Sequence, residues 1–322
     1  IQPTRLPYAS YFYDDESSTT RQDSGSWVYK AEWNGTLSDT LYLEARYGDF
    51  GYYFPLLSNC DQVASCDPAY FWRDTGLGEL TGGQARWQLD RDRKQYTAAA
   101  TYFLDTAKGS HTVKFGGELL KEVGWEGYQQ QFGGNIDHQY ANGRPSTVVF
   151  TLPTALQSED FGTRAANNND VLTSMSALDV FAAFINDTWS VGRLTINAGV
   201  RYDRYHGFLP EQQQLAASVG PVSVDAKTFA ETDMYTWNQI APRIGGTFDL
   251  SGDGKTVIKA NYGLFWHNPG VGVGSSANPN TTAKSGTYAW NDANGDRRWQ
   301  PGEEGNRTGL NLEGSIGLDP AI

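Results

Sequence analysis

The segment NDANGDRRWQPGEEG, residues 291–305, carries the oxygen spacing of a calcium-binding loop. In the twelve-residue window 292–303, oxygen-bearing side chains occupy positions 1, 3, 5, 9 and 12, which are ligand positions of an EF-hand loop. Because a hard cation prefers an all-oxygen cage, we predict a Ca2+ site here. The predicted ligands are the side chains of Asp292, Asn294, Asp296 and Glu303, the backbone carbonyl of Arg298, and Gln300 directly or through water.

Two features of this segment differ from an EF-hand. Arg297 stands at position 6, where an EF-hand has glycine for its sharp turn, and no helical pattern flanks the loop. Gly295 lies two residues earlier, and Trp299 supplies an apolar anchor after the backbone ligand. The alternative interpretation is a solvated acidic loop held by Asx-turns at Asp292 and Asn294.

A second acidic turn, DLSGDGKT at residues 249–256, gives a comparison within the same chain. It begins with a similar pattern, but Ala260 occupies position 12, so the bidentate carboxylate is missing. We therefore predict an ordinary hairpin turn at this place.

The chain has two cysteines, Cys60 and Cys66, in the polar segment SNCDQVASCDP. A disulfide between them would close a small loop and imply an oxidising compartment. The alternative is a pair of free thiols. We favour the disulfide, because the segment is rich in turn-forming residues and no other metal-type ligand lies beside the cysteines.

No pattern in the sequence indicates catalysis. A nucleophile elbow, a phosphate loop and a dinucleotide fingerprint are all missing from it. A net charge of −12 and a pI near 4.8 argue against a nucleic-acid partner, which calls for clustered Lys and Arg. We expect neither an enzyme nor a nucleic-acid-binding protein. The four histidines lack partners at zinc spacing: His111, His138, His206 and His267.

The composition indicates that β-strands must position these segments. The chain contains 10 Trp, 18 Tyr, 15 Phe and 36 Gly but only 2 Met, which is typical of pleated strands and turns. Four segments alternate apolar and polar residues around a short polar turn, so we predict β-hairpins. They span about residues 27–47, 96–122, 178–205 and 237–266.

The alternation separates two faces in each returning strand. In the third hairpin, for example, Leu194, Ile196 and Val200 alternate with Thr195 and Arg201. Charged residues on the polar faces could be taken for a catalytic array, but we interpret them as a paired, hydrated wall. This set comprises Glu44, Arg46, Lys114, Glu118, Arg201 and Lys259.

The spacing of the hairpins favours an outer-membrane barrel. Turns inside the hairpins are short, whereas long polar stretches separate them, at about residues 48–95, 125–177, 206–236 and 267–322. Barrels of the outer membrane have short periplasmic turns, long extracellular loops, an apolar lipid face and a polar lumen. A soluble β-sandwich is the alternative, but its turns recur evenly at both ends. No apolar stretch reaches the length of a membrane helix, and IQPTRLPYAS lacks the features of a secretory signal.

Two of the hairpins also carry a family pattern. FINDTWSVGRLTINAGVRYDRY (residues 184–205) and IAPRIGGTFDLSGDGKTVIKANYGLF (residues 240–265) resemble TonB-dependent outer-membrane receptors, in particular the Oar-like branch with a carboxypeptidase-regulatory-like domain. HTVKFGGELLKE (residues 111–122) is similar to an earlier strand of the family. The resemblance implies a 22-stranded barrel closed by a plug domain, which takes up scarce nutrients with energy from the TonB complex.

We expect this chain to be about eight strands of that larger barrel, because no plug domain, TonB-contacting segment or closing aromatic strand is found in residues 1–322. The predicted function is an outer-membrane receptor segment whose long loops bind an extracellular nutrient ligand and Ca2+. The alternative is a surface assembly or adhesion protein, in which loops fixed by Ca2+ and the disulfide contact neighbouring copies. Membrane lipid, the plug and the TonB complex are the other expected partners.

Overall fold

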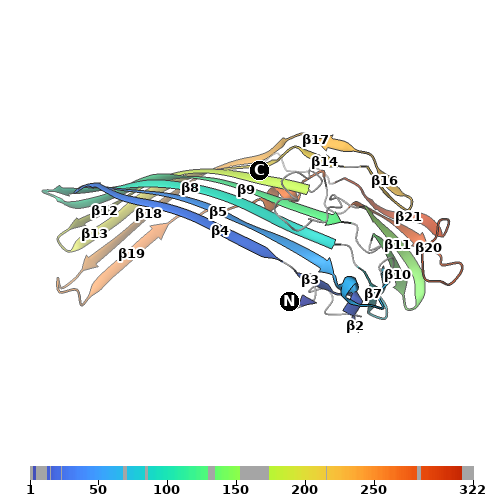
Figure 1. Ribbon diagram of the computed structural model, residues 1–322. Helices are drawn as coiled ribbons and strands as arrows, with labels where there is room; N and C mark the ends of the chain where they lie inside the picture. Colours follow the sequence, from blue (N-terminus) through green and yellow to red (C-terminus); the bar gives the residue numbers. More distant parts are fainter. Residues whose placement is uncertain are drawn as a thin grey trace.

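The computed structural model describes residues 3–4, 13–14, 16–22, 24–67, 71–83, 86–129, 135–152, 174–214, 216–280 and 284–313. In these ranges the chain is mostly β-strand, arranged as one long antiparallel sheet with a smaller sheet at one end (Figure 1). No helix among the described residues combines the length and hydropathy needed to cross a bilayer.

The long sheet is a series of neighbouring hairpins. Its eight long strands lie next to one another in chain order, and each pairs antiparallel with the next. The short strands β1 (Pro3–Thr4) and β3 (Thr20–Gln22) extend it beside the end of the second long strand. The long strands are β4 (Gly25–Ser38), β5 (Leu41–Ser58), β8 (Arg86–Thr106), β9 (Gly109–Gln129), β12 (Ser174–Val191), β13 (Leu194–Leu209), β18 (Thr232–Asp249) and β19 (Val257–Gly263).

The sheet is an open arc. Within the described residues, β4 and β19 lie at its two ends and do not pair with each other. The eight long strands therefore do not close as a small barrel, in agreement with the expectation of a segment from a larger one.

All four predicted hairpins are present, but most of their strands are longer than predicted. β5 continues to Ser58, β8 begins at Arg86, and β12 begins at Ser174, so the stretches predicted as loops at 48–95 and 125–177 began too early and ended too late. Beyond the bilayer a strand needs no apolar face, so charged residues replace the apolar ones while the hydrogen-bonded ladder continues.

The register gives the long sheet one apolar and one polar face. Residues paired across antiparallel strands point to the same side, and Tyr96, Leu119 and Phe181 form one such row on the apolar face. Glu118, the residue before Leu119, belongs to the polar face, where Arg201 donates a hydrogen bond to it at 3.0 Å. Leu119 is 55% exposed and Phe181 45% exposed, as expected for side chains that face lipid.

The described parts of the predicted loops contain β-strands instead of being irregular. Three of them, together with the N-terminal strand β2, supply a second sheet with the order β2-β7-β6-β10-β11-β20-β21, which lies at the loop end of the long sheet (Figure 1). The sequence pattern did not predict these strands, because they are short and pair with distant parts of the chain. The strands are β2 (Tyr13–Asp14), β6 (Phe71–Asp74), β7 (Glu79–Gly82), β10 (Ile136–Ala141), β11 (Arg144–Leu152), β20 (Lys284–Trp290) and β21 (Glu304–Asn311).

The second sheet has its own hydrophobic core. Val148, Phe150 and Leu152 on β11 have no exposed surface, and they pack with Trp72 and Trp290 from neighbouring strands. The predicted loop at 206–236 contributes to the same core, through buried valines of the small hairpin formed by β15 (Ala217–Val219) and β16 (Val222–Val224). A second small pair is formed by β14 (Gln212–Gln214) and β17 (Lys227–Phe229). All four predicted loops therefore contribute to one folded unit.

The connection from β19 to β20 folds against the polar face of the long sheet. Its short helix α2 (Gly272–Ser275) follows Val271, which is buried against Leu178, Tyr205 and Tyr235. The Tyr235 hydroxyl donates to the carbonyl of Gly270 at 3.2 Å. This segment covers the inner wall at its loop end.

Candidate functional site

The predicted cation loop is the turn between β20 and β21. The N–H of Asn291 donates to the carbonyl of Glu303 at 3.1 Å, which closes the turn at its base. All six predicted ligand residues therefore lie within a single turn at the edge of the second sheet.

Side-chain oxygens of the first half of the loop accept hydrogen bonds from its own backbone. Asp292 Oδ1 accepts from the N–H of Gly295 at 2.9 Å, and its Oδ2 accepts from Arg297 at 3.0 Å. Asn294 Oδ1 accepts from Asp296 at 3.0 Å. These are the Asx-turns of the alternative interpretation. An ionised carboxylate has about four acceptor positions, so these bonds do not exhaust the oxygens of Asp292.

Glu303, at position 12, folds back over the loop. Its Oε1 accepts from the N–H of Ala293 at 3.1 Å, and its Oε2 accepts from the N–H of Gln300 at 3.0 Å. The Gln300 side chain donates to Asp296 Oδ2 at 2.6 Å. In the described part of the chain, no three His, Cys, Asp or Glu side chains are gathered as a metal centre.

Arg297 has a left-handed backbone conformation. Its φ is +65°, and among the described residues only Asn142 is another non-glycine residue with positive φ. The sequence departs from the EF-hand pattern at position 6, but the backbone there has the handedness that glycine usually provides. A non-glycine residue in this region costs about 1–3 kcal/mol and persists only where its surroundings impose it.

The loop is fixed to the second sheet by its aromatic and acidic residues. The Tyr140 hydroxyl donates to Asp292 Oδ2 at 3.2 Å. The Trp299 ring packs edge-on against Phe150 with a centroid distance of 4.8 Å, and its Nε1 donates to Glu304 at 2.9 Å. Burial raises the pKa of Glu304, but hydrogen bonds from backbone N–H groups and from Trp299 outweigh this and lower the pKa below its usual value.

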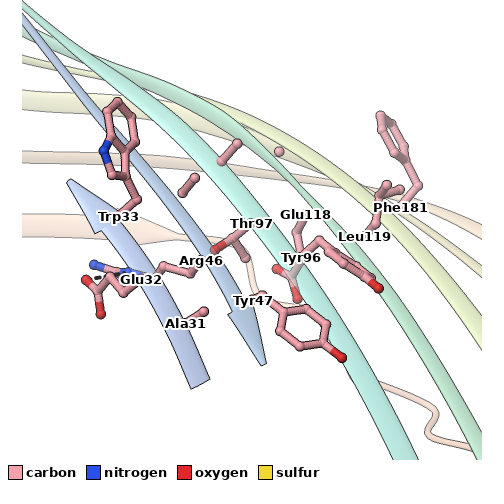
Figure 2. Close-up of a pocket in the computed structure, with 13 residues that line it drawn as sticks. Ala31, Glu32, Trp33, Arg46, Tyr47, Tyr96, Thr97, Glu118, Leu119 and Phe181 are labelled. Atoms are coloured by element: carbon pink, nitrogen blue, oxygen red, sulfur yellow. Dashed lines mark hydrogen bonds and ion pairs between the residues drawn. The ribbon is translucent and has the colours of Figure 1, made fainter. Parts of the chain in front are cut away.

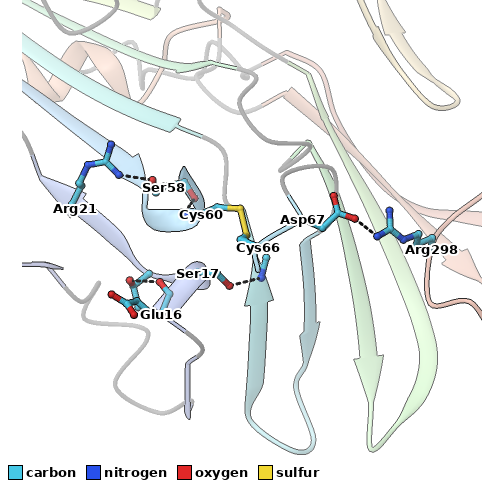
Figure 3. Close-up of a disulfide and its surroundings, with 10 residues drawn as sticks. Glu16, Ser17, Arg21, Ser58, Cys60, Cys66, Asp67 and Arg298 are labelled. Atoms are coloured by element: carbon cyan, nitrogen blue, oxygen red, sulfur yellow. Dashed lines mark hydrogen bonds and ion pairs between the residues drawn. A yellow bond between two sulfur atoms is a disulfide. The ribbon is translucent and has the colours of Figure 1, made fainter. Parts of the chain in front are cut away.

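Cys60 and Cys66 form the predicted disulfide, with a Cα–Cα distance of 5.4 Å. It closes the segment around the short helix η3 (Asn59–Gln62), next to the end of β5. Asp67, which follows Cys66, forms an ion pair with Arg298 of the predicted cation loop (Figure 3). The two segments singled out from the sequence are thus in direct contact, although Asp67 and Arg298 are 231 positions apart in the chain.

Asp74 is a structural residue that the sequence analysis missed. Its carboxylate is fully buried and accepts N–H groups from Gly76 and Leu77 of one hairpin turn and from Asn142 and Gly143 of another. Burial raises the pKa of Asp74, but the four backbone donors outweigh burial and lower the pKa below its usual value. The tripeptide DTG is typical of a turn, and nothing in it signals a buried carboxylate.

The four histidines stay outside any metal-type cluster of the described residues. His138 is buried in the second sheet, where its Nδ1 lies 2.8 Å from the carbonyl of Phe71 and burial lowers its pKa. His111 and His206 each contact one carboxylate, Asp187 and Asp233 respectively, at 2.7 Å.

The polar face of the long sheet is a network of ion pairs. Lys114 lies 2.7 Å from Glu44, and Arg201 bridges Glu118 and Asp203 at 3.0 Å and 2.8 Å. Each of these charges has an opposite charge beside it, as the interpretation of a hydrated wall predicts.

Comparison with known proteins gives three kinds of match. Residues 3–307 match the family described as an outer membrane beta barrel domain. Over 180 residues the chain is 26% identical to the TonB-dependent transporter Oar of Myxococcus xanthus, a match that covers 54% of this chain and 15% of the relative.

Two solved receptors match this chain with TM-scores below 0.5. The ferric-catecholate import receptor Fiu from E. coli K12 in its open form is 14% identical, with a TM-score of 0.47, over 87% of this chain and 40% of the receptor. The siderophore receptor PiuA from Acinetobacter baumannii is 12% identical, with a TM-score of 0.43, over 84% of this chain and 37% of the receptor. This chain therefore spans less than half the length of each of these proteins.

Proposed function

Since the chain belongs to the family of outer membrane beta barrel domains, we propose that it is the loop-bearing segment of a TonB-dependent receptor that imports an extracellular nutrient. Its location is the bacterial outer membrane. The Oar relative is a TonB-dependent transporter, which supports the proposal. The lipid, plug domain and TonB complex are then its partners in the full-length protein.

The second sheet is the observation that carries the proposed ligand binding. Three of the four predicted loops contribute strands to one sheet, and the fourth packs buried valines into its core, so the outward surface is held in shape before a ligand arrives. A preorganised surface loses less conformational entropy on binding than mobile loops do. Binding residues also concentrate on loops that a rigid scaffold positions.

Uptake by cells tests this proposal. Cells with and without the full-length protein would be supplied with ferric siderophores, cobalamin, oligosaccharides or oligopeptides as separate probes. We expect uptake of one class to require both the protein and a functional TonB. Normal uptake of every class in cells that lack the protein would contradict the proposal.

We further infer that the turn at residues 291–303 binds Ca2+ in the full-length protein. Asp292, Asn294, Asp296 and Glu303 would supply side-chain oxygens, Arg298 its carbonyl, and Gln300 a direct or water-mediated contact. The left-handed backbone at Arg297 supports this assignment. Asp292 accepts three hydrogen bonds, so about one acceptor position of its carboxylate is left for the cation. When bound, the cation would neutralise the loop and fix its shape.

Terbium luminescence tests the site, since Trp290 directly precedes the loop and Trp299 lies within it, and both can sensitise a bound lanthanide. We expect saturable, calcium-displaceable emission with an affinity of about 0.1–1 mM for Ca2+, the range of extracellular modules. Glu303→Gln should abolish it. A double substitution in the comparison turn, D249N/D253N, should leave it unchanged, and equal emission from the Glu303→Gln protein would contradict the assignment.

A further inference from the structure

The apolar face of the long sheet contains a hollow with a volume of about 600 Å³. Its floor is formed by three small residues that are direct cross-strand neighbours, Ala45, Ala98 and Gly117. Trp33 stands on one side and Phe181 on the other (Figure 2). Large side chains around a small-residue floor leave a groove instead of a flat surface.

The hollow lies near the outer end of the membrane-spanning part of the sheet. A transmembrane strand takes about 9–11 residues. From the end of β8 at Thr106 back to Tyr96 there are eleven residues, and Tyr96 and its partner Leu119 line the hollow. Tyr96 is also at the height where an aromatic girdle is expected. The hollow therefore opens toward the outer leaflet of the membrane.

Two lysines lie directly beyond it. Lys94 and Lys121 are cross-strand partners on the same face, two residues outward from Tyr96 and Leu119, which is about 6.6 Å along a strand. Both are exposed, and the side chain of Lys121 is 74% exposed with Asp179 at 3.8 Å. Like charges directly opposite each other destabilise a sheet unless a counter-charge lies between them.

Each of the two lysines has one aspartate on its far side in the same cross-strand row, and neither aspartate lies between them. Asp49 is the cross-strand neighbour of Lys94, but its carboxylate accepts hydrogen bonds from Trp27 Nε1 and the Tyr47 hydroxyl, both at 3.1 Å. In the described part of the chain, no carboxylate forms an ion pair with Lys94. A negative group could approach both lysines from the outer leaflet.

We propose that this place binds an anionic lipid of the outer leaflet, with an acyl chain in the hollow and a phosphate between Lys94 and Lys121. The hollow matches a hydrocarbon chain in chemistry, and the lysines match a phosphate in charge and height. A second copy docked on the same surface would instead bring two more lysines to the same rim. The inference depends only on the outer-membrane location and not on the transported ligand or on Ca2+.

Native mass spectrometry of the full-length protein tests the proposal with diphosphorylated lipid A as the probe. Replacing both lysines in K94Q/K121Q should weaken its binding roughly thirtyfold, from about fivefold for each lysine near a membrane surface. The matched control K108Q/K255Q removes the same charge from periplasmic turns and should bind like the wild type. Circular dichroism would verify that each variant is folded.

Two further probes and one variant that fills the hollow distinguish the contribution of the acyl chain from that of the lipid phosphate. Dephosphorylated lipid A should bind as weakly to the wild type as lipid A does to K94Q/K121Q, and inorganic phosphate should not displace lipid A. Ala98→Leu, which fills the hollow, should weaken lipid A binding while Lys94 and Lys121 stay in place. The proposal would be overturned if K108Q/K255Q lost as much lipid A binding as K94Q/K121Q, or if the dephosphorylated lipid bound the wild type as tightly as lipid A does. Displacement of lipid A by inorganic phosphate would also overturn it. So would an altered oligomeric state of Ala98→Leu with unchanged lipid binding.

Discussion

At the scale of single residues, buried Asp74 links two hairpin turns through four backbone N–H groups. Asp74→Asn would place an amide hydrogen against donors that need an acceptor. We expect the second sheet to lose about 3 kcal/mol of stability, because a hydrogen bond to a charged group contributes about 1.5–3 kcal/mol and an unsatisfied buried group adds to the loss. Hydrogen exchange of the amides of Asn142 and Gly143 measures this, with exposed Asp225→Asn as the control.

The lowered pKa of Asp74 also predicts a pH dependence. The pKa of an aspartate in an unfolded chain is about 3.9, and the pKa of folded Asp74 is lower. Such a carboxyl group stabilises the fold at pH values above the unfolded pKa. This contribution is lost as the pH falls through the folded pKa. Unfolding of the second sheet should therefore become easier below about pH 4 in the wild type. The Asp74→Asn protein should lack this acid dependence, and parallel pH profiles for the two proteins would refute the assignment.

Arg297 permits a test of backbone strain. Glycine adopts its φ of +65° without steric cost, whereas a β-branched residue does so poorly. Arg297→Gly also removes the stacking of the guanidinium over Trp72 at 5.8 Å, which contributes about 0.5–1 kcal/mol at an exposed site. We expect Arg297→Gly to keep or strengthen terbium binding and Arg297→Val to weaken it by about 2 kcal/mol relative to glycine. Equal binding by both variants would show that the left-handed conformation is not required.

At the scale of elements, the disulfide segment and the cation loop support each other through Asp67 and Arg298. Closing a loop of this size stabilises the fold by about 2 kcal/mol in the chain-entropy description, whereas an exposed ion pair contributes only about 0–1 kcal/mol. The covalent bond should therefore dominate.

Removing the bridge in C60S/C66S should raise hydrogen exchange strongly at residues 58–67 and weakly at 297–299. Asp67→Asn, which keeps the bridge, should affect only the second region. Strong exchange at 297–299 in both variants would mean that the ion pair, and not the disulfide, holds the two segments together.

The sequence predicted some elements well and missed others for physical reasons. In the membrane, lipid on one side and water on the other impose strict alternation, so the hairpins could be located from residues such as Leu194 to Val200. Outside the membrane that constraint disappears. The core of the second sheet depends on Val148 and Phe150 meeting Trp72 and Trp290 from distant parts of the chain, and no local period records such contacts. The spacing of oxygen-bearing residues singled out the segment 291–305, but the sequence did not predict the ion pair of Arg298 with Asp67.

At the scale of the whole molecule, the resemblance to TonB-dependent receptors of the Oar-like branch is confirmed by the match to the Oar transporter and by the family match over residues 3–307. Self-association through the loops and the identity of the ligand stay predictions. Different interactions should stabilise the two sheets. The long sheet depends on its ladder and on lipid, whereas the second sheet depends on a small core, one disulfide and the proposed cation.

Calcium removal should therefore act on one sheet only. In the full-length protein, chelation with EGTA should expose residues 291–303 to protease while the long strands stay resistant. Magnesium added back in place of calcium should not restore protection, because Mg2+ dehydrates reluctantly and demands a stricter octahedral geometry. Identical cleavage with and without EGTA would contradict a structural role for the cation. Dispersal of an ordered surface array by EGTA, with single barrels intact, would favour the assembly function instead.

The origin of the second sheet bears on how the protein reaches its native state. β6, β10 and β20 come from connections far apart in the chain, whereas each long strand pairs with the strand that directly precedes or follows it among the eight. Pairings between distant segments form slowly, because their closure entropy must be overcome before the contacts stabilise anything. We expect the long hairpins to insert first and the surface sheet to assemble last. Length changes in any of these connections should consequently be tolerated less than length changes in ordinary surface loops.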